Sequence, residues 1–459
     1  MRGNKLLSFA VAGALCCSLA GCAGGQKDSD GTEQAGQSNE KKHITINVKS
    51  PAMATPFDAE HENAEIMDML KEAGEAFCAT YEDADVTINY TKFQYVDESA
   101  ETIGKAGTAD AADVVFAGQF NVPTYITEGY AVPLDDVIDD ALRADIDDAI
   151  WQQCMTDGKT YVLPYYQLQN TLVVNADIMR AAGLERFLTT DGSVAQWSTD
   201  EFNEILQTLK ASSADESTYP LALWAANNQG DTHTLSLLRA YGSTIYDDEG
   251  RFNLSTPEGI AALSWMKDLD DQGIVPKGAE NMELANVIEL FYHGQLALCP
   301  GNQTQLLVDR PADFEPMLAN FPTLDGKGCA TTFLTGFTVF DNDDADRIRV
   351  AKDFVRYLYT SDDYLRYSAA GVPLSKSYLE RNGDTMEGAA VIEAFANNSP
   401  QVVDFLNNTP NWSGVREAFY PNIQDLLRGT KTPEEVAAAI DESCNAAIDE
   451  GRGKAADAS

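Results

Sequence analysis

The stretch that decides the fold reads Asp157-Gly158-Lys159-Thr160-Tyr161-Val162-Leu163-Pro164-Tyr165-Tyr166, then Thr171-Leu172-Val173-Val174-Asn175-Ala176-Asp177, then Ala181-Ala182-Gly183-Leu184. Its first part predicts a turn at Gly158 followed by a strand, since β-branched and aromatic residues favour strands. The second part predicts a strand that ends in an Asn-x-Asp sequence. The third predicts a short helix that ends at Gly183.

The residues before this stretch alternate between strand and helix patterns. Strands are predicted at 43–48, 85–90 and 112–117, and a helix at 64–81. Strands that alternate with helices predict a mostly parallel sheet covered by helices. Ligands of such sheets bind at the carboxyl ends of the strands, so the segments 50–58 and 118–121 are the first candidate ligand loops.

Three further segments carry motifs in a fixed order. They are Trp197-Ser198-Thr199-Asp200-Glu201-Phe202, Phe291-Tyr292-His293-Gly294-Gln295-Leu296-Ala297-Leu298 and Leu426-Leu427-Arg428-Gly429-Thr430-Lys431-Thr432-Pro433-Glu434-Glu435. The first and third predict helix starts, and the second predicts a helix that closes at a glycine before a strand. Together with 157–184 they resemble the motifs of extracellular solute-binding protein family 1, the maltose-binding-protein-like lipoproteins that bind sugars for ABC importers. The resemblance covers roughly residues 42–450.

The resemblance implies an α/β fold of the periplasmic-binding-protein type, a bilobal Venus flytrap whose lobes are joined by a multi-strand hinge. Lobe one is expected at 42–168 and 334–373, and lobe two at 169–333 and 374–455. The residues agree with crossings near these bounds, because a strand pattern follows a glycine-containing loop at both places. The implied function is to capture a carbohydrate, a di- or oligosaccharide, between the lobes and to deliver it to the permease subunits of an ABC transporter.

A sugar ring sets the chemistry of such a site. A pyranose has an apolar face and an edge of hydroxyls, so its site needs aromatic rings and planar polar groups. At the positions that the family uses, the candidate substrate-binding residues are Gln119, Tyr165, Gln167, Trp224, Asp231, His233, Asn302, Gln303, Trp412 and Arg416. The segment 301–304 lacks the bulky aromatic residue that the family often has there, so no second stacking platform is predicted at that turn.

Several aromatic residues also fit the hydrophobic core. Trp197 and Trp265 lie at helical spacing among apolar residues and are predicted to be core residues. Trp224 fits a position over the sheet as well as one in the site. Tyr165 and Tyr166 point to opposite sides of an extended chain, which predicts one ring in the core and one in the site.

The first 21 residues are typical of a secretory signal peptide. Arg2 and Lys5 precede an apolar run that ends Leu19-Ala20-Gly21-Cys22, and this run is too short to span a bilayer as a helix. Its ending resembles a bacterial lipobox, which implies a lipid on Cys22 and a protein anchored on the extracellular face of the cell membrane. The alternative is an ordinary cleaved signal. Residues 22–41 are polar and predict a flexible tether.

Composition excludes other classes of function. The formal net charge of −40 argues against nucleic-acid binding, because such a surface repels phosphates. The scattered cysteines after residue 22 predict neither a disulfide framework nor a zinc site, with a Cys299–Cys329 bridge as an alternative. The acidic run at 341–346 predicts a solvated helix start, because it lacks the glycine and the distal glutamate of an EF-hand loop.

The sequence carries no catalytic signature. It has no G-x-S-x-G, no H-E-x-x-H and no P-loop, and its four histidines predict no triad or metal cluster. His233 fits a solvated helix start as well as a site. We therefore expect a monomeric binding protein that is not an enzyme and has no cofactor. The alternatives are a binder of another polar solute, such as glycerol phosphate or a polyamine, and a surface carbohydrate-active enzyme.

Overall fold

The computed structural model describes residues 41–55, 57, 59–61, 63–94, 97–213, 217–302, 314–386, 388–405, 409 and 411–458. The predicted signal peptide, Cys22, most of the tether and the candidate Gln303 lie outside the described residues. Residues 42–459 form one compact unit.

The first strands and helix lie where the sequence predicts them. They are β1 (His43–Pro51), α1 (Ile66–Thr80), β2 (Asp85–Phe93) and β3 (Val114–Gly118). β1 pairs in parallel with β2 and with β3. Glu65 and Asp68 form a capping box at the start of α1, which satisfies backbone N–H groups that have no partner within the helix.

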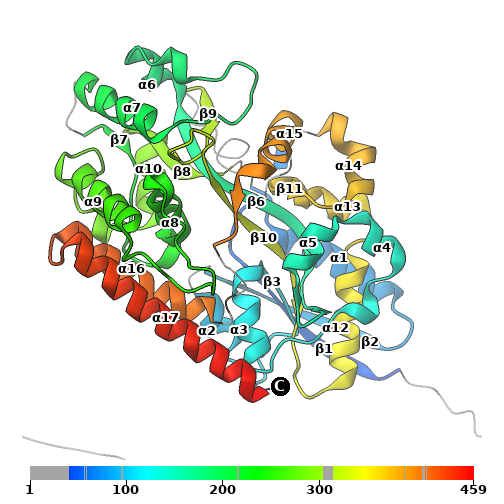
Figure 1. Cartoon of the computed structure of the whole chain (residues 1–459). Coiled ribbons are helices and arrows are strands. Elements are labelled where there is room, and N and C mark those ends of the chain that lie inside the picture. The colour runs from blue at the N-terminus through cyan, green and yellow to red at the C-terminus, as the bar shows by residue number, and fades with distance from the viewer. Residues whose placement is uncertain are drawn as a thin grey trace, which may run out of the picture. The chain divides into compact units, whose positions relative to one another are not determined.

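Two long strands join the two halves of the sheet. β6 (Leu163–Asn175) pairs antiparallel with β10 (Ala330–Val339), and the strand order is β2-β1-β3-β10-β6-β8-β7. β8 (Leu296–Gly301) and β9 (Pro316–Ala319) pair antiparallel with β6, whereas β7 (Tyr219–Leu221) pairs in parallel with β8. The predicted mostly parallel sheet is therefore corrected to a mixed sheet, because chain crossings between the halves reverse the strand direction (Figure 1).

The crossing strands approach each other closely at one glycine. The pairing of β10 with β6 shifts between Thr335 and Gly336. A Cβ atom at Gly336 would lie 2.3 Å from the carbonyl oxygen of Leu163. This β-bulge therefore needs glycine, because any side chain would collide with the neighbouring backbone.

Helices cover the sheet on both halves (Figure 1). The longer ones are α7 (Thr199–Ser212), α8 (Asp231–Leu238), α9 (Pro257–Asp271), α10 (Leu284–Tyr292), α12 (Ala345–Tyr357), α15 (Ala389–Asn398), α16 (Trp412–Arg428) and α17 (Pro433–Ala458). Shorter ones are α2 (Glu98–Thr102), α3 (Val122–Thr127), α4 (Asp140–Asp145), α5 (Asp148–Gln153), α6 (Ala176–Ala181), α13 (Asp362–Leu365) and α14 (Lys376–Asn382). Three of the motif predictions are confirmed, because α7 begins with a capping box at Ser198, α10 feeds β8 through Gly294, and α17 begins at Pro433.

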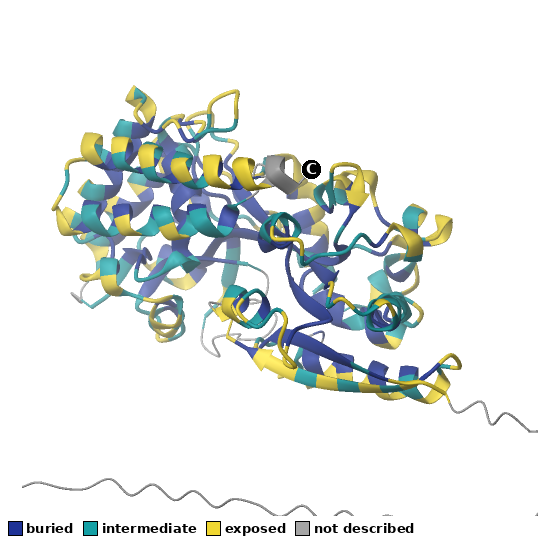
Figure 2. Cartoon of the chain, turned by 90° about the horizontal axis from the view of Figure 1, so that it is seen from below, coloured by how far each residue is buried: buried dark blue, intermediate teal, exposed yellow. Residues whose placement is uncertain are grey.

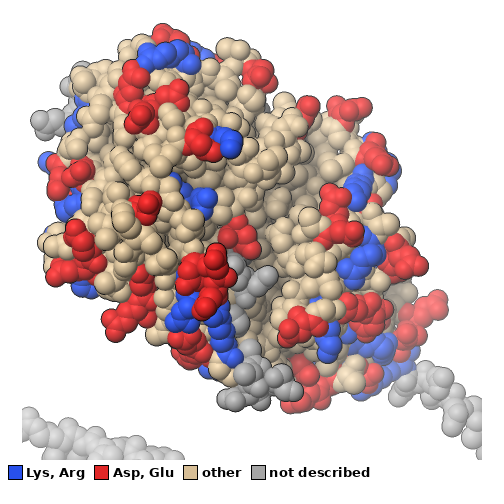
Figure 3. All heavy atoms as spheres, viewed as in Figure 1, with Lys and Arg blue, Asp and Glu red and all other residues tan. Residues whose placement is uncertain are grey.

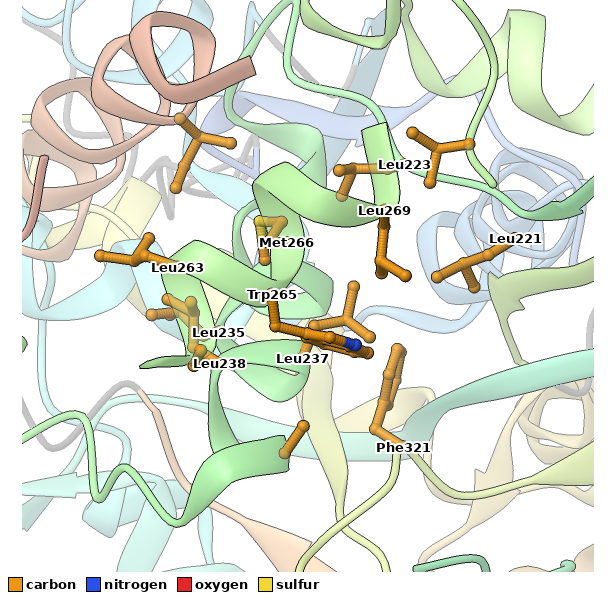
Figure 4. Packing of buried hydrophobic residues seen from close by; sticks show 14 of the residues in the cluster. Leu221, Leu223, Leu235, Leu237, Leu238, Leu263, Trp265, Met266, Leu269 and Phe321 are labelled. Carbon is orange, nitrogen blue, oxygen red and sulfur yellow. The ribbon is translucent and has the colours of Figure 1, made fainter. Parts of the chain in front are cut away.

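Two large hydrophobic cores lie under these helices (Figure 2). One takes its residues from 44–168 and 334–378, and the other mainly from 172–329 and 405–448. Trp197 and Trp265 pack in the second core, as predicted, and Figure 4 shows Trp265 among the surrounding leucines and Phe321. Phe120 also belongs to the second core although it directly follows β3, so its side chain reaches across from the first half of the sheet.

Other sequence predictions are resolved by the described residues. Cys299 and Cys329 are both thiols, so the alternative of a bridge between them is wrong. Asp344 accepts hydrogen bonds from the backbone N–H groups of Asp346 and Arg347, which confirms a helix start at the acidic run. Within the described part of the chain, no group of acidic, histidine or cysteine side chains is placed to hold a metal ion, and no helix has the length and hydropathy to cross a membrane.

Candidate functional site

A cavity between two distant segments of the chain is the first candidate site. One wall comes from residues 119–162 and the other from residues 404–412. The lining residues are Gln119, Phe120, Val122, Pro123, Gln153, Cys154, Met155, Thr156, Val162, Asp404, Thr409 and Trp412. We call it the aromatic cavity, after the rings of Phe120 and Trp412. Its free volume is about 30 Å³. This is room for one or two water molecules and not for a sugar ring.

Trp412 is both a core residue and a wall of this cavity. It is the first residue of α16, and Asn411 caps the helix by accepting a hydrogen bond from the Gly414 N–H. Its side chain is 2% exposed, and its Nε1–H has no hydrogen-bond partner among the described residues. Because a buried N–H without a partner is unfavourable, this group is a donor in position for a ligand.

The segment after β3 is held against the start of α16. The hydroxyl of Ser413 donates a hydrogen bond to Oδ1 of Asn121 over 2.8 Å. The guanidinium of Arg416 lies 5.0 Å from the centre of the Phe120 ring, close enough for a cation–π interaction. These contacts connect the two halves of the sheet at the edge of the aromatic cavity.

Arg416 and Asp231, two predicted site residues, form a buried ion pair. Nε of Arg416 lies 2.5 Å from Oδ2 of Asp231, and Arg416 also donates to the carbonyl oxygen of Asn228. The side chains are 12% and 2% exposed. Asp231 is the first residue of α8, where the helix dipole favours a negative charge. Removing one partner would leave a buried charge unpaired, which typically costs about 3–5 kcal/mol.

A second cavity lies on the other side of the contact between Asn121 and Ser413. Its free volume is about 240 Å³. Its lining residues are Glu98, Ser99, Asn121, Asn228, Ser413, Gly414, Arg416 and Glu417. We call it the polar cavity. Consecutive residues line the two cavities, Phe120 and Asn121 in one segment and Trp412 and Ser413 in the other, so the cavities are neighbours.

Glu98 is the unusual residue of the polar cavity. It begins α2 and is 1% exposed. The hydroxyl of Tyr125 donates to its Oε1 over 2.7 Å, whereas its Oε2 has no hydrogen-bond partner among the described residues. Burial raises the pKa of Glu98 to about 7, an effect that the neighbouring Asn121, the hydroxyl of Tyr125 and the charge of Arg416 oppose.

Trp224 and His233 lie together but line neither cavity. Their ring centres are 5.1 Å apart. His233 is 8% exposed and buried beside Phe321, so the interpretation of a solvated helix start is wrong. Burial lowers the pKa of His233 to about 4, which keeps the ring neutral near neutral pH. Neither the indole N–H of Trp224 nor the ring nitrogens of His233 have hydrogen-bond partners among the described residues.

Tyr165 and Tyr166 are both core residues, which corrects the prediction that one of them faces the site. The hydroxyl of Tyr165 donates to the carbonyl oxygen of Tyr364, and its ring packs edge-on against Phe116. An extended strand brings one ring to a free face only when one face of the sheet is open. Here both rings are buried, because segments after β10 pack on them: Tyr364 against Tyr165 and Gly371 against Tyr166.

The remaining predicted residues have different surroundings. Gln119 lines the aromatic cavity, but its Oε1 already accepts a hydrogen bond from the Leu334 N–H over 2.9 Å. Gln167 is half-buried within β6, and Asn302 is half-buried directly after β8. Neither lines the aromatic or the polar cavity.

The candidate residues of the sequence analysis did not include Glu98, Asp404 and Ser413, which line the two cavities. Asn121 belongs to the loop 118–121, which was a candidate ligand loop because it follows the carboxyl end of a predicted strand. The same rule applied to the second strand would have selected the segment after β2, where α2 begins with Glu98. No sequence pattern points to Asp404.

Comparison with known proteins identifies the family. The profile of bacterial extracellular solute-binding proteins matches residues 62–364 of this chain. The chain belongs to this family. Among curated proteins it is 25% identical over 231 residues to putative binding proteins of Brucella abortus (strain 2308) and Brucella suis biovar 1 (strain 1330). The match covers 50% of this solute-binding protein, which spans about half the length of those relatives.

Solved structures show the same fold. Maltose-bound MalE3 of T. maritima superposes with a TM-score of 0.70 at 16% identity, covering 87% of this solute-binding protein and 99% of that chain. Lmo0181 of Listeria monocytogenes in complex with cycloalternan gives a TM-score of 0.70 at 16% identity. The superposition covers 89% of this protein and 100% of Lmo0181. MalE of Bdellovibrio bacteriovorus bound to maltotriose gives a TM-score of 0.69 at 16% identity. The superposition covers 88% of this protein and 100% of that MalE chain. This solute-binding protein therefore has the bilobal α/β fold of periplasmic binding proteins.

Proposed function

We propose that this protein captures a carbohydrate between its two lobes and hands it to the permease of an ABC importer. The observation that carries this proposal is the aromatic cavity, where Phe120 and Trp412 come from opposite sides together with the amide groups of Gln119 and Gln153. Rings that cover an apolar sugar face and amides that bond its hydroxyls are the groups that a saccharide needs. Solved structures of the same fold hold maltose, maltotriose and cycloalternan.

We further propose that the lobes are residues 42–168 with 334–373 and residues 169–333 with 374–455. The two hydrophobic cores take their residues from similar ranges, which supports this division. We also propose that the lipid on Cys22 anchors the monomer to the extracellular face of the membrane. Mass spectrometry of the mature N-terminus would detect that lipid, and an unmodified N-terminus beyond Cys22 would contradict it.

A thermal-shift screen tests carbohydrate binding. Maltose, cellobiose, longer oligosaccharides and monosaccharides are each added to the purified protein. A ligand at about 100 times its Kd should stabilise the folded state by roughly 2.7 kcal/mol, so a binder raises the melting temperature. Glycerol phosphate and putrescine are the comparison ligands, and a shift with one of these and with no sugar would overturn the proposal.

Catalysis is tested separately with a chromogenic glycoside. A glycosidase needs two carboxyl groups on opposite sides of the scissile bond. A binding protein should release no chromophore from a glycoside whose parent sugar raises the melting temperature. Turnover would favour the surface carbohydrate-active enzyme instead.

A further inference from the structure

The polar cavity is lined by charged side chains of both signs. Three charged side chains line it: Glu98, Arg416 and Glu417. The charge of Arg416 is balanced by Asp231 at 2.5 Å. The two carboxyl groups of Glu98 and Glu417 are left, so the ionised cavity carries net negative charge.

The two carboxyl groups differ in their hydrogen bonds. Oε1 of Glu417 accepts a hydrogen bond from the side-chain amide of Asn228 over 2.6 Å, and Glu417 is exposed. Glu98 is 1% exposed, and its Oε2 has no partner among the described residues. A buried carboxylate oxygen at a cavity wall is an acceptor in position for a ligand, since buried polar atoms are nearly always hydrogen-bonded in the functional state.

We propose that the polar cavity is a subsite for a protonated amine, and that the sugar unit bound beside Glu98 is an amino sugar. This inference rests on the proposed function of carbohydrate capture. A neutral hydroxyl would satisfy Oε2 with one hydrogen bond, whereas an ammonium group adds a charge-assisted bond and neutralises the excess negative charge. A cation beside Glu98 would also favour its ionised form against the burial that raises the pKa to about 7.

Because the two cavities are neighbours, one ligand can occupy both of them. Phe120 and Trp412 supply rings on one side of the Asn121–Ser413 contact, and Glu98 lies on the other side. A disaccharide places two sugar units side by side in the same way. The expected ligand therefore has one unit that stacks on a ring and a second unit that carries the amine.

Isothermal titration calorimetry with matched sugars tests the subsite. The purified full protein is titrated near neutral pH with the β-1,4-linked disaccharide of glucosamine and with cellobiose, which has the same linkage and no amine. Its N-acetylated form is the third ligand, because acetylation removes the positive charge. The amine form should bind at least about tenfold more tightly than each neutral form.

Two matched variants locate the preference. Glu98→Gln keeps the shape and the acceptor for Tyr125 but removes the charge, and it should abolish the preference for the amine. Glu417→Gln removes one charge from the same cavity and should keep the preference within about threefold. Melting temperatures of the ligand-free variants verify that both remain folded.

Three outcomes overturn the inference. Equal affinities of wild type for the three disaccharides would show that no amine is selected. A preference that persists in Glu98→Gln, or that falls equally in both variants, would show that Glu98 makes no direct contact with the amine. If no sugar of any kind binds, both the proposed function and the inference fail, whereas binding of cellobiose without selection of the amine leaves the proposed function intact.

Discussion

At the scale of single residues, Glu98 combines burial with a titration near neutral pH. The groups that face its carboxyl are Asn121 after β3, Tyr125 on α3 and Arg416 on α16. Of these only Arg416 carries a charge, and Asp231 already pairs with it. Burial therefore dominates, and the carboxyl group keeps its proton to higher pH in the folded protein than in the unfolded chain.

The residue-scale prediction concerns stability against pH. Between about pH 4.5 and 7 the folded state holds a proton at Glu98 that the unfolded state releases. Stability should therefore fall as the pH rises through this window, by at most roughly 3 kcal/mol for a shift of this size. Chemical denaturation across the window should show that Glu98→Gln gains stability over wild type as the pH rises.

The comparison must be made between variant and wild type. His233 has the opposite dependence, because burial lowers its pKa from 6.5 to about 4 and the unfolded state binds the extra proton there. Wild-type stability alone therefore mixes two slopes of opposite sign. Glu417→Gln is the control, because it removes the other glutamate carboxyl group of the same cavity. A pH-independent difference between Glu98→Gln and wild type would contradict a raised pKa.

At the scale of elements, the first turns of α16 serve the core and both cavities. Trp412 packs in the second core and lines the aromatic cavity, while Ser413, Arg416 and Glu417 line the polar cavity. Trp412 and Arg416 thus lie one turn apart on α16, as predicted, but they line different cavities. Trp412→Ala does not separate these roles, because deleting a buried indole typically costs about 3–5 kcal/mol.

The element-scale prediction uses Trp412→Phe. This change keeps an aromatic ring and removes the Nε1–H, which has no partner among the described residues. Sugar affinity should fall by a factor of about 5–10, the contribution of one hydrogen bond, if the N–H donates to the ligand. Calorimetric titration with the best sugar of the thermal screen measures this.

Trp197→Phe is the matched control for this measurement. Its Nε1–H donates to the carbonyl oxygen of Phe187 inside the core, so the variant should lose stability by about 1 kcal/mol or more and keep its affinity. Unchanged affinity in Trp412→Phe would assign Trp412 to the core alone.

At the scale of the whole molecule, the structure is closed over the aromatic cavity. The space of about 30 Å³ is too small for a sugar. The halves are held by the Ser413–Asn121 hydrogen bond, by Arg416 over Phe120, and by the ion pair of Lys454 with Glu128 between α17 and the end of α3. The face in Figure 3 shows acidic and basic side chains interspersed over both halves. We therefore expect the ligand-free protein in solution also to populate a more open state, in which a sugar can enter between the halves.

The whole-molecule prediction is that ligand binding favours a closed state. A sugar that contacts residues of both halves binds that state better, and only such differential affinity shifts the equilibrium. Small-angle scattering should show a smaller radius of gyration with saturating sugar than without it. A sugar that gave no thermal shift is the control. An identical radius of gyration with and without the bound sugar would leave a rigid binder and contradict the hinge.

The sequence by itself determined the local elements and the family. The spacing of apolar residues, the cap at Ser198 and the proline at 433 act over a few residues, so α1, β1, α7 and α17 could be predicted from neighbours along the chain. The order of the motifs was enough to indicate a bilobal solute-binding protein. The family match confirms the family, and the solved structures confirm the fold.

Only the tertiary structure decided which side chains meet. Tyr165 is buried because distant segments such as the one around Tyr364 pack on it, and its neighbours in sequence do not record those contacts. Glu98 and Arg416 lie near each other because the tertiary fold brings α2 and α16 to one cavity. Burial and pairing depend on contacts between residues far apart in the chain, and single-sequence patterns carry no information about such contacts.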